Sequence, residues 1–96
     1  MRRERVLQQL STFHSEYRDE FGIFRIGVFG SVARGDAEGA RDVDLVVELE
    51  HPDLLTLVAI KQELEALLQE SVDLVRYREE MNGLLRERIE KDAIYV

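Results

Sequence analysis

The sequence predicts one α/β domain of the α+β kind, in which helices pack on a mixed β-sheet of three to four strands. Two observations lead to this prediction. Short stretches rich in β-branched and aromatic residues alternate with longer stretches whose apolar residues recur at helical spacing. The chain has 96 residues, of which 45% are hydrophobic, which is enough for a single two-layer core but not for a second domain. We therefore expect residues 1–96 to form a single two-layer domain.

The first part of the chain predicts a helix, a strand and a glycine-rich turn. Apolar residues recur every three or four positions over residues 2–18, which is typical of an amphipathic helix. Residues 24–29 are aromatic and β-branched and too few for a helix, so they predict a strand, with Phe24 facing the core. Residues 30–40 hold three of the six glycines and predict a turn with room for one short helical turn.

The middle of the chain predicts a second strand followed by a helix. Apolar and mostly acidic residues alternate over residues 42–50, the pattern of a strand with one buried face. Pro52 and Asp53 are residue types that favour the start of a helix, and helical spacing continues to about residue 69.

The last part of the chain predicts a strand at residues 71–77, a helix at about 80–91, and an apolar tail at 93–96 that can add a further strand. A helix between the second and third strands is the usual connection of a parallel pair, whereas the first two strands can form a hairpin. The charged residues 86–88 are expected to lie on the solvated face of the last helix.

Charge and composition limit the function. Thirteen basic residues against twenty acidic ones give a net charge of −7, which argues against direct nucleic-acid binding because such binding needs basic patches. A nucleotide needs only local positive groups or a bound cation. The absence of cysteine excludes disulfides, thiolate zinc sites and cysteine nucleophiles. No apolar run has the length of a membrane span, so we expect a cytoplasmic protein with no membrane partner.

A Gly-Ser turn directly after the first predicted strand is the first candidate site. Gly30 and Ser31 would expose backbone N–H groups and a hydroxyl, which suit a phosphate. Arg34 would add a full positive charge with a forked set of donors. The alternative is a connecting turn that needs glycine only for its backbone angles.

Two aspartates in the second predicted strand are the second candidate. Asp42 and Asp44 are two positions apart, so their carboxylates share one face, about 6.6–6.8 Å apart along the backbone. Carboxylate oxygens are good ligands for Mg²⁺, and carboxylates from different strands can hold two such ions for phosphoryl transfer. The alternative is that Glu48 and Glu50, on the same face, make the whole row the solvated side of the strand.

Asp73, in the otherwise apolar third strand, is the third candidate. Aspartate is depleted from strands, and an unpaired buried carboxylate is costly. A bound metal or a partner charge would remove this cost. The alternatives are an edge position or an ion pair with Arg76 or Arg78.

Together the three features resemble a known family. Residues 29–31 read FGS and, ten residues later, residues 42–45 read DVDL, which resembles the signature of the nucleotidyltransferases related to DNA polymerase β. Residues 30–35, GSVARG, together with VDLV at 72–75, are more closely similar to the minimal nucleotidyltransferase (MNT) family. The single-domain length also fits that family.

The resemblance implies roles for these residues. Asp42 and Asp44 would hold two Mg²⁺ ions, and Asp73 would complete the metal site on the side of the attacking hydroxyl and accept its proton. Gly30 and Ser31 would cradle the β- and γ-phosphates of a nucleoside triphosphate, with help from Arg34.

The resemblance also implies a partner. MNT proteins of this kind are paired with a small helical HEPN-domain toxin, and the MNT protein is the antitoxin that transfers AMP to it, typically to a tyrosine. We therefore expect ATP as the donor and a HEPN-domain toxin as acceptor in a hetero-oligomer. Two alternatives stay open, a binding-only antitoxin that occludes its partner and an enzyme that nucleotidylates a small molecule. One departure from many relatives is Arg41, which stands where a small hydroxyl residue is common.

Overall fold

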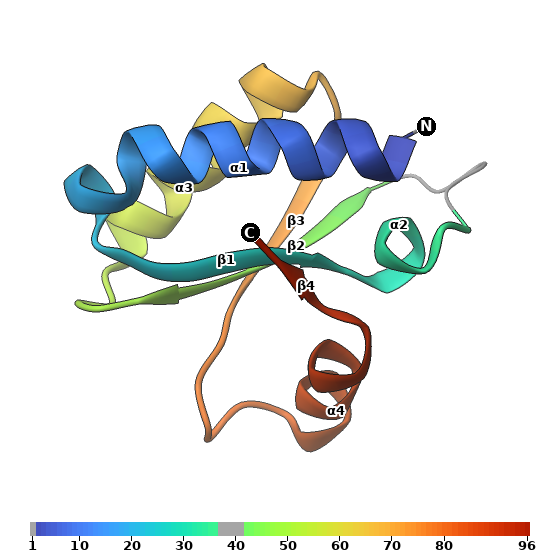
Figure 1. The fold of residues 1–96 in the computed structure, drawn as a ribbon. Coiled ribbons are helices and arrows are strands. Elements are labelled where there is room, and N and C mark those ends of the chain that lie inside the picture. The colour runs from blue at the N-terminus through green and yellow to red at the C-terminus, as the bar shows by residue number, and fades with distance from the viewer. Residues whose placement is uncertain (1, 37–41) are drawn as a thin grey trace.

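The fold is built on a mixed four-stranded sheet in the order β3-β2-β1-β4, seen in a computed structural model that describes residues 2–36 and 42–96 (Figure 1). The strands are β1 (Ile23–Phe29), β2 (Val43–Leu49), β3 (Val72–Arg76) and β4 (Ile94–Tyr95). This architecture confirms the predicted fold class, including the additional strand at the end of the chain.

Strand pairing brings the candidate residues to one end of the sheet. β1 and β2 are antiparallel with Phe29 opposite Asp44, as the predicted hairpin requires. β2 and β3 are parallel with Asp44 opposite Asp73, so the predicted crossover is also confirmed. β4 pairs antiparallel with β1, with Val28 opposite Ile94. Since β1 ends where β2 begins, the residues around Phe29 and the two aspartates meet at the same end of the sheet.

The helices α1 (Arg2–Phe21) and α3 (Leu54–Leu68) cover one face of the sheet and form the larger core with it (Figure 1). The completely buried residues of these helices recur three or four positions apart, as predicted. Asp53 caps α3, accepting a hydrogen bond from the Leu55 N–H at 3.2 Å. None of the helices in residues 2–36 and 42–96 is long and apolar enough to cross a membrane.

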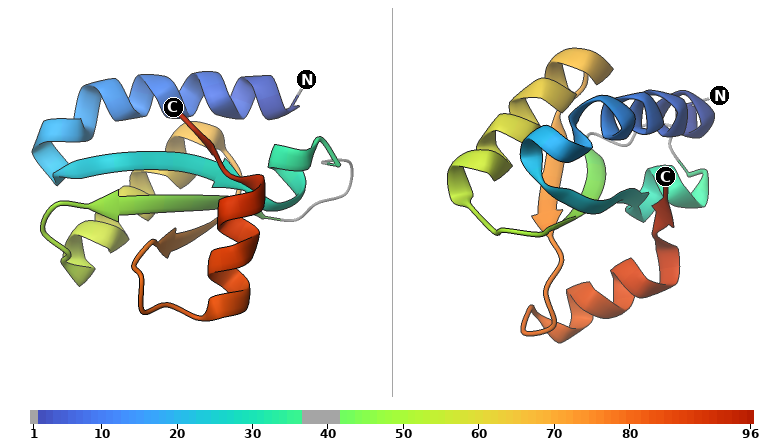
Figure 2. Two further views of the ribbon diagram at one scale, coloured as in Figure 1. Left: turned by 60° about the horizontal axis from the view of Figure 1, so that its bottom comes forward. Right: turned by 60° about the vertical axis from the view of Figure 1, so that its left-hand side comes forward.

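The helix α4 (Gly83–Asp92) lies on the other face of the sheet, opposite α1 (Figure 2). Its residue Ile89 is completely buried and packs with Phe29 of β1 and Val46 of β2. The helix starts three residues later than predicted because Asn82 caps it, accepting a hydrogen bond from the Leu85 N–H at 3.1 Å. This helix gives the two-layer domain a partial third layer.

The prediction that Phe24 faces the core is wrong, because 61% of this residue is exposed. The pairing of β1 with β2 shifts between Ile23 and Arg25, an irregularity of the kind made by a β-bulge. Ile23 and Ile26, three positions apart, therefore enter the same core. Strict alternation along the sequence cannot reveal such a shift.

The packing of α4 predicts that Ile89→Ala lowers the free energy of unfolding by about 2–5 kcal/mol, since it leaves a cavity in the second core. Leu84→Ala on the same helix is the matched control, because Leu84 is 78% exposed and should change stability by less than about 0.5 kcal/mol. Urea denaturation followed by circular dichroism measures both. Equal losses for the two variants would contradict the packing of α4 on the sheet.

Candidate functional site

The Gly-Ser turn leads directly from β1 into the short helix α2 (Gly30–Arg34), as the sequence allowed. Gly30 has φ = +71°, a left-handed conformation that residues with a side chain rarely adopt. The helix ends at Gly35, also at positive φ, whose N–H donates to the Val32 carbonyl at 3.1 Å. Ser31 is half-buried in the first turn of this helix.

Asp44 lies against the backbone of Gly30. A Cβ added at Gly30 would overlap the Asp44 carboxylate and would lie 3.1 Å from its Cγ. Position 30 therefore requires glycine for two reasons, the positive φ of its backbone and the close approach of the Asp44 carboxylate. The contact joins two of the predicted site elements, the Gly-Ser turn and the paired-aspartate strand.

The other two aspartates are neighbours of Asp44. Asp73 is its register partner on the adjacent parallel strand, and Asp42 immediately precedes β2. Val43 and Leu45 point into the larger core, so Asp44 between them points to the face that α4 partly covers. The structure thus gathers the three predicted carboxylates at one end of the sheet.

The alternatives for these aspartates can be tested against the structure. Val46 is on the same face of β2 as Asp44 and is completely buried beside Ile89, so this face is not simply a solvated row. Asp73 is exposed, but it forms no ion pair with any residue in the described part of the chain, including Arg76 and Arg78. Since β3 is an edge strand of the sheet, the alternative of an edge position is confirmed for Asp73, whereas the alternative of an ion pair with Arg76 or Arg78 is not.

The electrostatics of the site centre on Asp44. Burial raises the pKa of the Asp44 carboxyl above its ordinary value, and the like charges of Asp73 and Asp42 raise it further. The guanidinium groups of Arg88 and Arg34 lower the same pKa and offset only part of this effect. Ionising the whole cluster thus creates a concentration of negative charge that a divalent cation would relieve.

The donor chemistry fits such a cation, since carboxylate oxygens are the ligands that Mg²⁺ prefers. Within residues 2–36 and 42–96, no three carboxylate or imidazole side chains are gathered closely enough to hold one metal ion as they stand. The joint ligation of metal by Asp42, Asp44 and Asp73 stays a prediction.

Arg34 is held by two carboxylates. Its Nη1 lies 2.8 Å from Asp92 Oδ2 on α4, and its Nε lies 3.2 Å from Asp36 Oδ2. The predicted phosphate contacts of Gly30, Ser31 and Arg34 stay predictions. Arg41 lies outside the described residues.

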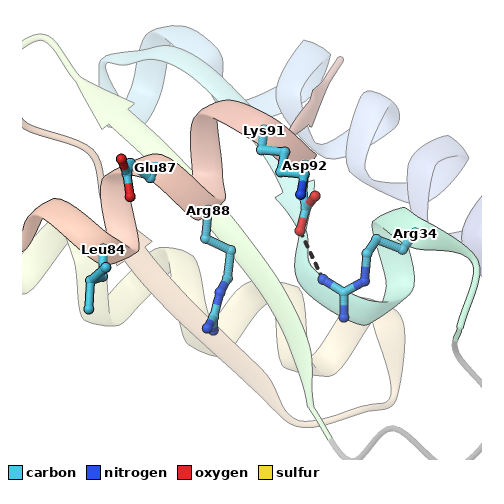
Figure 3. Close-up of a pocket in the computed structure, with 6 residues that line it drawn as sticks. All are labelled: Arg34, Leu84, Glu87, Arg88, Lys91 and Asp92. Carbon is cyan, nitrogen blue, oxygen red and sulfur yellow. Dashed lines mark hydrogen bonds and ion pairs between the residues drawn. The ribbon is translucent and has the colours of Figure 1, made fainter.

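A pocket of about 410 Å³ lies between α2 and α4 (Figure 3). Its lining consists of Arg34, Leu84, Glu87, Arg88, Lys91 and Asp92. The sequence analysis did not assign any α4 residue to a site. Glu87 and Arg88 are exposed, as predicted, and both line the pocket, whereas Arg86 is half-buried. Helical spacing shows that Leu84 and Arg88 share a face, but not that this face meets α2.

The chain is similar to known proteins in sequence and in fold. The family model described as "Nucleotidyltransferase domain" matches residues 10–96. The chain is 37% identical over 94 residues to the protein adenylyltransferase MntA of Thermococcus cleftensis, covering 97% of this chain and 94% of the relative.

Two solved structures are also similar to the chain. One, of a protein assigned as a minimal nucleotidyltransferase, is 38% identical with a TM-score of 0.71, covering 96% of this chain and 89% of that one. The other is a tri-AMPylated Shewanella oneidensis HEPN toxin in complex with its MNT antitoxin, with a TM-score of 0.68, 21% identity, and coverage of 94% of this chain and 70% of that one. At that identity, the second likeness shows the fold alone.

Replacing Gly30 tests the close approach of Asp44. Gly22 is the matched control, since it also has positive φ but has nothing within 4 Å of an added Cβ. We expect Gly22→Ala to cost about 1–2 kcal/mol of unfolding free energy through backbone strain alone. Gly30→Ala should cost more and should also change the Asp44 titration, measured by NMR of its carboxyl carbon. A Gly30→Ala variant with an unchanged Asp44 signal would contradict the contact.

Removing the Asp73 charge tests the electrostatic coupling. Because the Asp73 carboxylate disfavours ionised Asp44, Asp73→Asn should move the pKa of Asp44 down toward its ordinary value. The NMR titration midpoint of the Asp44 carboxyl carbon would shift to lower pH. Asp19→Asn, at a highly exposed carboxylate outside this cluster, is the control and should leave the midpoint in place. An unchanged midpoint in Asp73→Asn would show that the two carboxylates are not coupled.

Proposed function

Since the chain belongs to the nucleotidyltransferase family, we propose that it is a Mg²⁺-dependent protein adenylyltransferase that acts as the antitoxin of a HEPN-domain toxin. The enzyme class follows from the family. The donor ATP, the metal and the protein acceptor are parts of the proposal, and each has its own support.

One observation carries the proposal, namely the pairing of Asp44 with Asp73 beside Gly30. Two parallel strands place their carboxylates side by side, and the turn that would receive phosphates contacts one of them directly. Phosphoryl transfer asks a protein mainly for positioning and for neutralisation of charge, with little covalent chemistry. The paired strands at this end of the sheet and the adjacent Gly-Ser turn would provide the positioning.

In the proposed reaction, a hydroxyl oxygen of the acceptor attacks the α-phosphorus of ATP. The new oxygen–phosphorus bond forms as the bond to the bridging oxygen of the β-phosphate breaks, so AMP is transferred and pyrophosphate leaves. Gly30 and Ser31 orient the β- and γ-phosphates, and Arg34 adds positive charge at the same turn. Asp73 accepts the proton of the attacking hydroxyl, which its exposure and its lack of an ion pair in the described residues permit.

The carboxylates are the proposed metal ligands. Asp42, Asp44 and Asp73 would hold two Mg²⁺ ions, which would neutralise the phosphate charges and make the α-phosphorus a better electrophile. The raised pKa of Asp44 supports this assignment. Burial and the like charges of Asp73 and Asp42 raise this pKa, and bound cations would offset those like charges.

The protein acceptor is proposed from the relatives. The Thermococcus relative is named a protein adenylyltransferase, and the Shewanella structure pairs an MNT antitoxin with an AMPylated HEPN toxin. We extend both the reaction and the partner to this chain, with a tyrosine of the toxin as the modified residue. The net charge of −7 suits a basic partner and predicts that their association weakens as salt is added.

The proposal predicts that Asp44→Asn, nearly identical in shape, lowers AMP transfer at least about 100-fold, because it removes a charge that would hold the metal. The measurement follows α-³²P-labelled ATP into a co-expressed HEPN-domain partner, with and without EDTA. Glu50→Gln is the matched control, because Glu50 is an exposed carboxylate beyond the opposite end of β2.

The outcomes separate the proposal from the alternatives. Loss of labelling in Asp44→Asn and in EDTA, with the control fully active, supports metal-dependent transfer. Full labelling by Asp44→Asn would contradict it. If the Asp44→Asn variant does not label the toxin but still neutralises it at stoichiometric amounts, the protein would instead be a binding-only antitoxin.

A further inference from the structure

We propose that Arg88 of α4 binds the phosphate chain of the nucleoside triphosphate, forming with α2 the two sides of the donor pocket. This inference rests on the proposed function and extends it to a residue outside the sequence motif. Arg88 lines the pocket of about 410 Å³ between the two helices, on the opposite side from Arg34 of α2 (Figure 3).

The pocket is connected to the carboxylates through α2. Arg34, on the other wall of the pocket from Arg88, belongs to the helix that begins at Gly30, and the Asp44 carboxylate lies against Gly30. A polyphosphate bound between Arg88 and Arg34 would therefore lie next to the turn that the Asp44 carboxylate contacts. The buried neighbour Ile89 anchors this part of α4 to the sheet, so Arg88 projects from a fixed helix.

The charge of Arg88 is available for a ligand. Arg34 is already paired with Asp92 and Asp36, whereas Arg88 forms no ion pair or hydrogen bond with any described residue. Glu87, the preceding residue of α4, also lines the pocket, but no ion pair joins it to Arg88 in the described part of the chain. Arg88 is exposed on the wall of the pocket, so its charge can reach a ligand.

The other arginine of the same helix shows what a structural role looks like here. Arg86 donates from Nη1 to the Glu79 carbonyl at 3.0 Å, and its Nε lies 3.9 Å from Glu90 Oε2. The first contact joins α4 to the preceding turn, and the second lies within α4. Arg88 has no comparable contacts within the fold, and a planar guanidinium with forked donors is well suited to phosphate oxygens.

The two ends of the pocket also differ in a way that suits a nucleotide. Arg34, Lys91 and Asp92 make one end charged. At the other end lie Glu87 and Leu84 (Figure 3), and Leu84, one helical turn before Arg88, is 78% exposed. A nucleotide could place its anionic phosphate chain at the charged end and its flat apolar base beside Leu84. Arg88 lies between the two ends.

The test measures binding of α,β-methylene-ATP with Mg²⁺ by calorimetry, since this analogue cannot undergo transfer. Arg88→Gln should bind it about 10- to 100-fold more weakly, the loss expected for a charge-assisted contact with phosphate. Arg88→Lys should bind with intermediate affinity. Arg78→Gln is the charge-matched control, because Arg78 is exposed beyond the far end of β3, and it should bind as the wild type does. Inorganic tripolyphosphate should lose affinity for Arg88→Gln to a similar extent.

Each outcome decides a specific point. Wild-type affinity in Arg88→Gln, or equal losses in Arg88→Gln and Arg78→Gln, would overturn the role of Arg88 and leave the proposed function intact. Loss of the ATP analogue with no change for tripolyphosphate would also overturn it, since the contact would then not be to phosphate. A wild-type protein that binds neither ligand would overturn the proposed function itself.

Discussion

The approach of the Asp44 carboxylate to the backbone of Gly30 is the constraint on which the site depends. It requires β1 to end opposite the start of β2, which the register of Phe29 with Asp44 provides. The parallel pairing of β2 with β3 then places Asp73 beside the same carboxylate without any loop having to position it. Because strands fix both pairings, the carboxylates are held by the most rigid part of the domain, as sites built on regular elements generally are. One turn and two strand registers therefore determine the geometry.

The second face of the sheet explains why the site is not open on all sides. Ile89 packs on Phe29 and Val46, and this small second core holds α4 over the strands that carry the aspartates. The same helix places Asp92 against Arg34 of α2. Stability and site geometry are thus linked through α4, since loosening its packing would also release one wall of the pocket. The larger core under α1 and α3 carries most of the buried residues and leaves the aspartate face free for chemistry.

Much of this arrangement could be predicted from the sequence, because local signals determine it. The alternation over residues 42–50 predicts the face on which Asp44 lies, and a helix between two strands predicts their parallel pairing, which brings Asp73 next to it. What the sequence did not reveal depends on irregularity or on distant packing. The register shift near Ile23 that turns Phe24 outward has no sequence signal of its own. The role of Arg88 depends on where α4 settles against α2, which contacts far apart in the chain decide.

The distribution of charge bears on the proposed binding of a polyphosphate together with cations. The chain carries a net charge of −7, and Asp42 and Asp73 both act electrostatically on Asp44, so bare phosphates would be repelled from that end of the sheet. Arg34 and Arg88 act against this repulsion, but Arg34 already shares its charge with Asp92 and Asp36. Within the described residues, the fold therefore does not neutralise its own acidic centre. Divalent cations bound by the aspartates would supply the positive charge that this centre lacks. A polyphosphate bound together with such ions would then be attracted by Arg34 and Arg88 as well. The strand pairing that places Asp44 beside Asp73 thus also creates the negative charge that makes a divalent cation necessary to the proposed reaction.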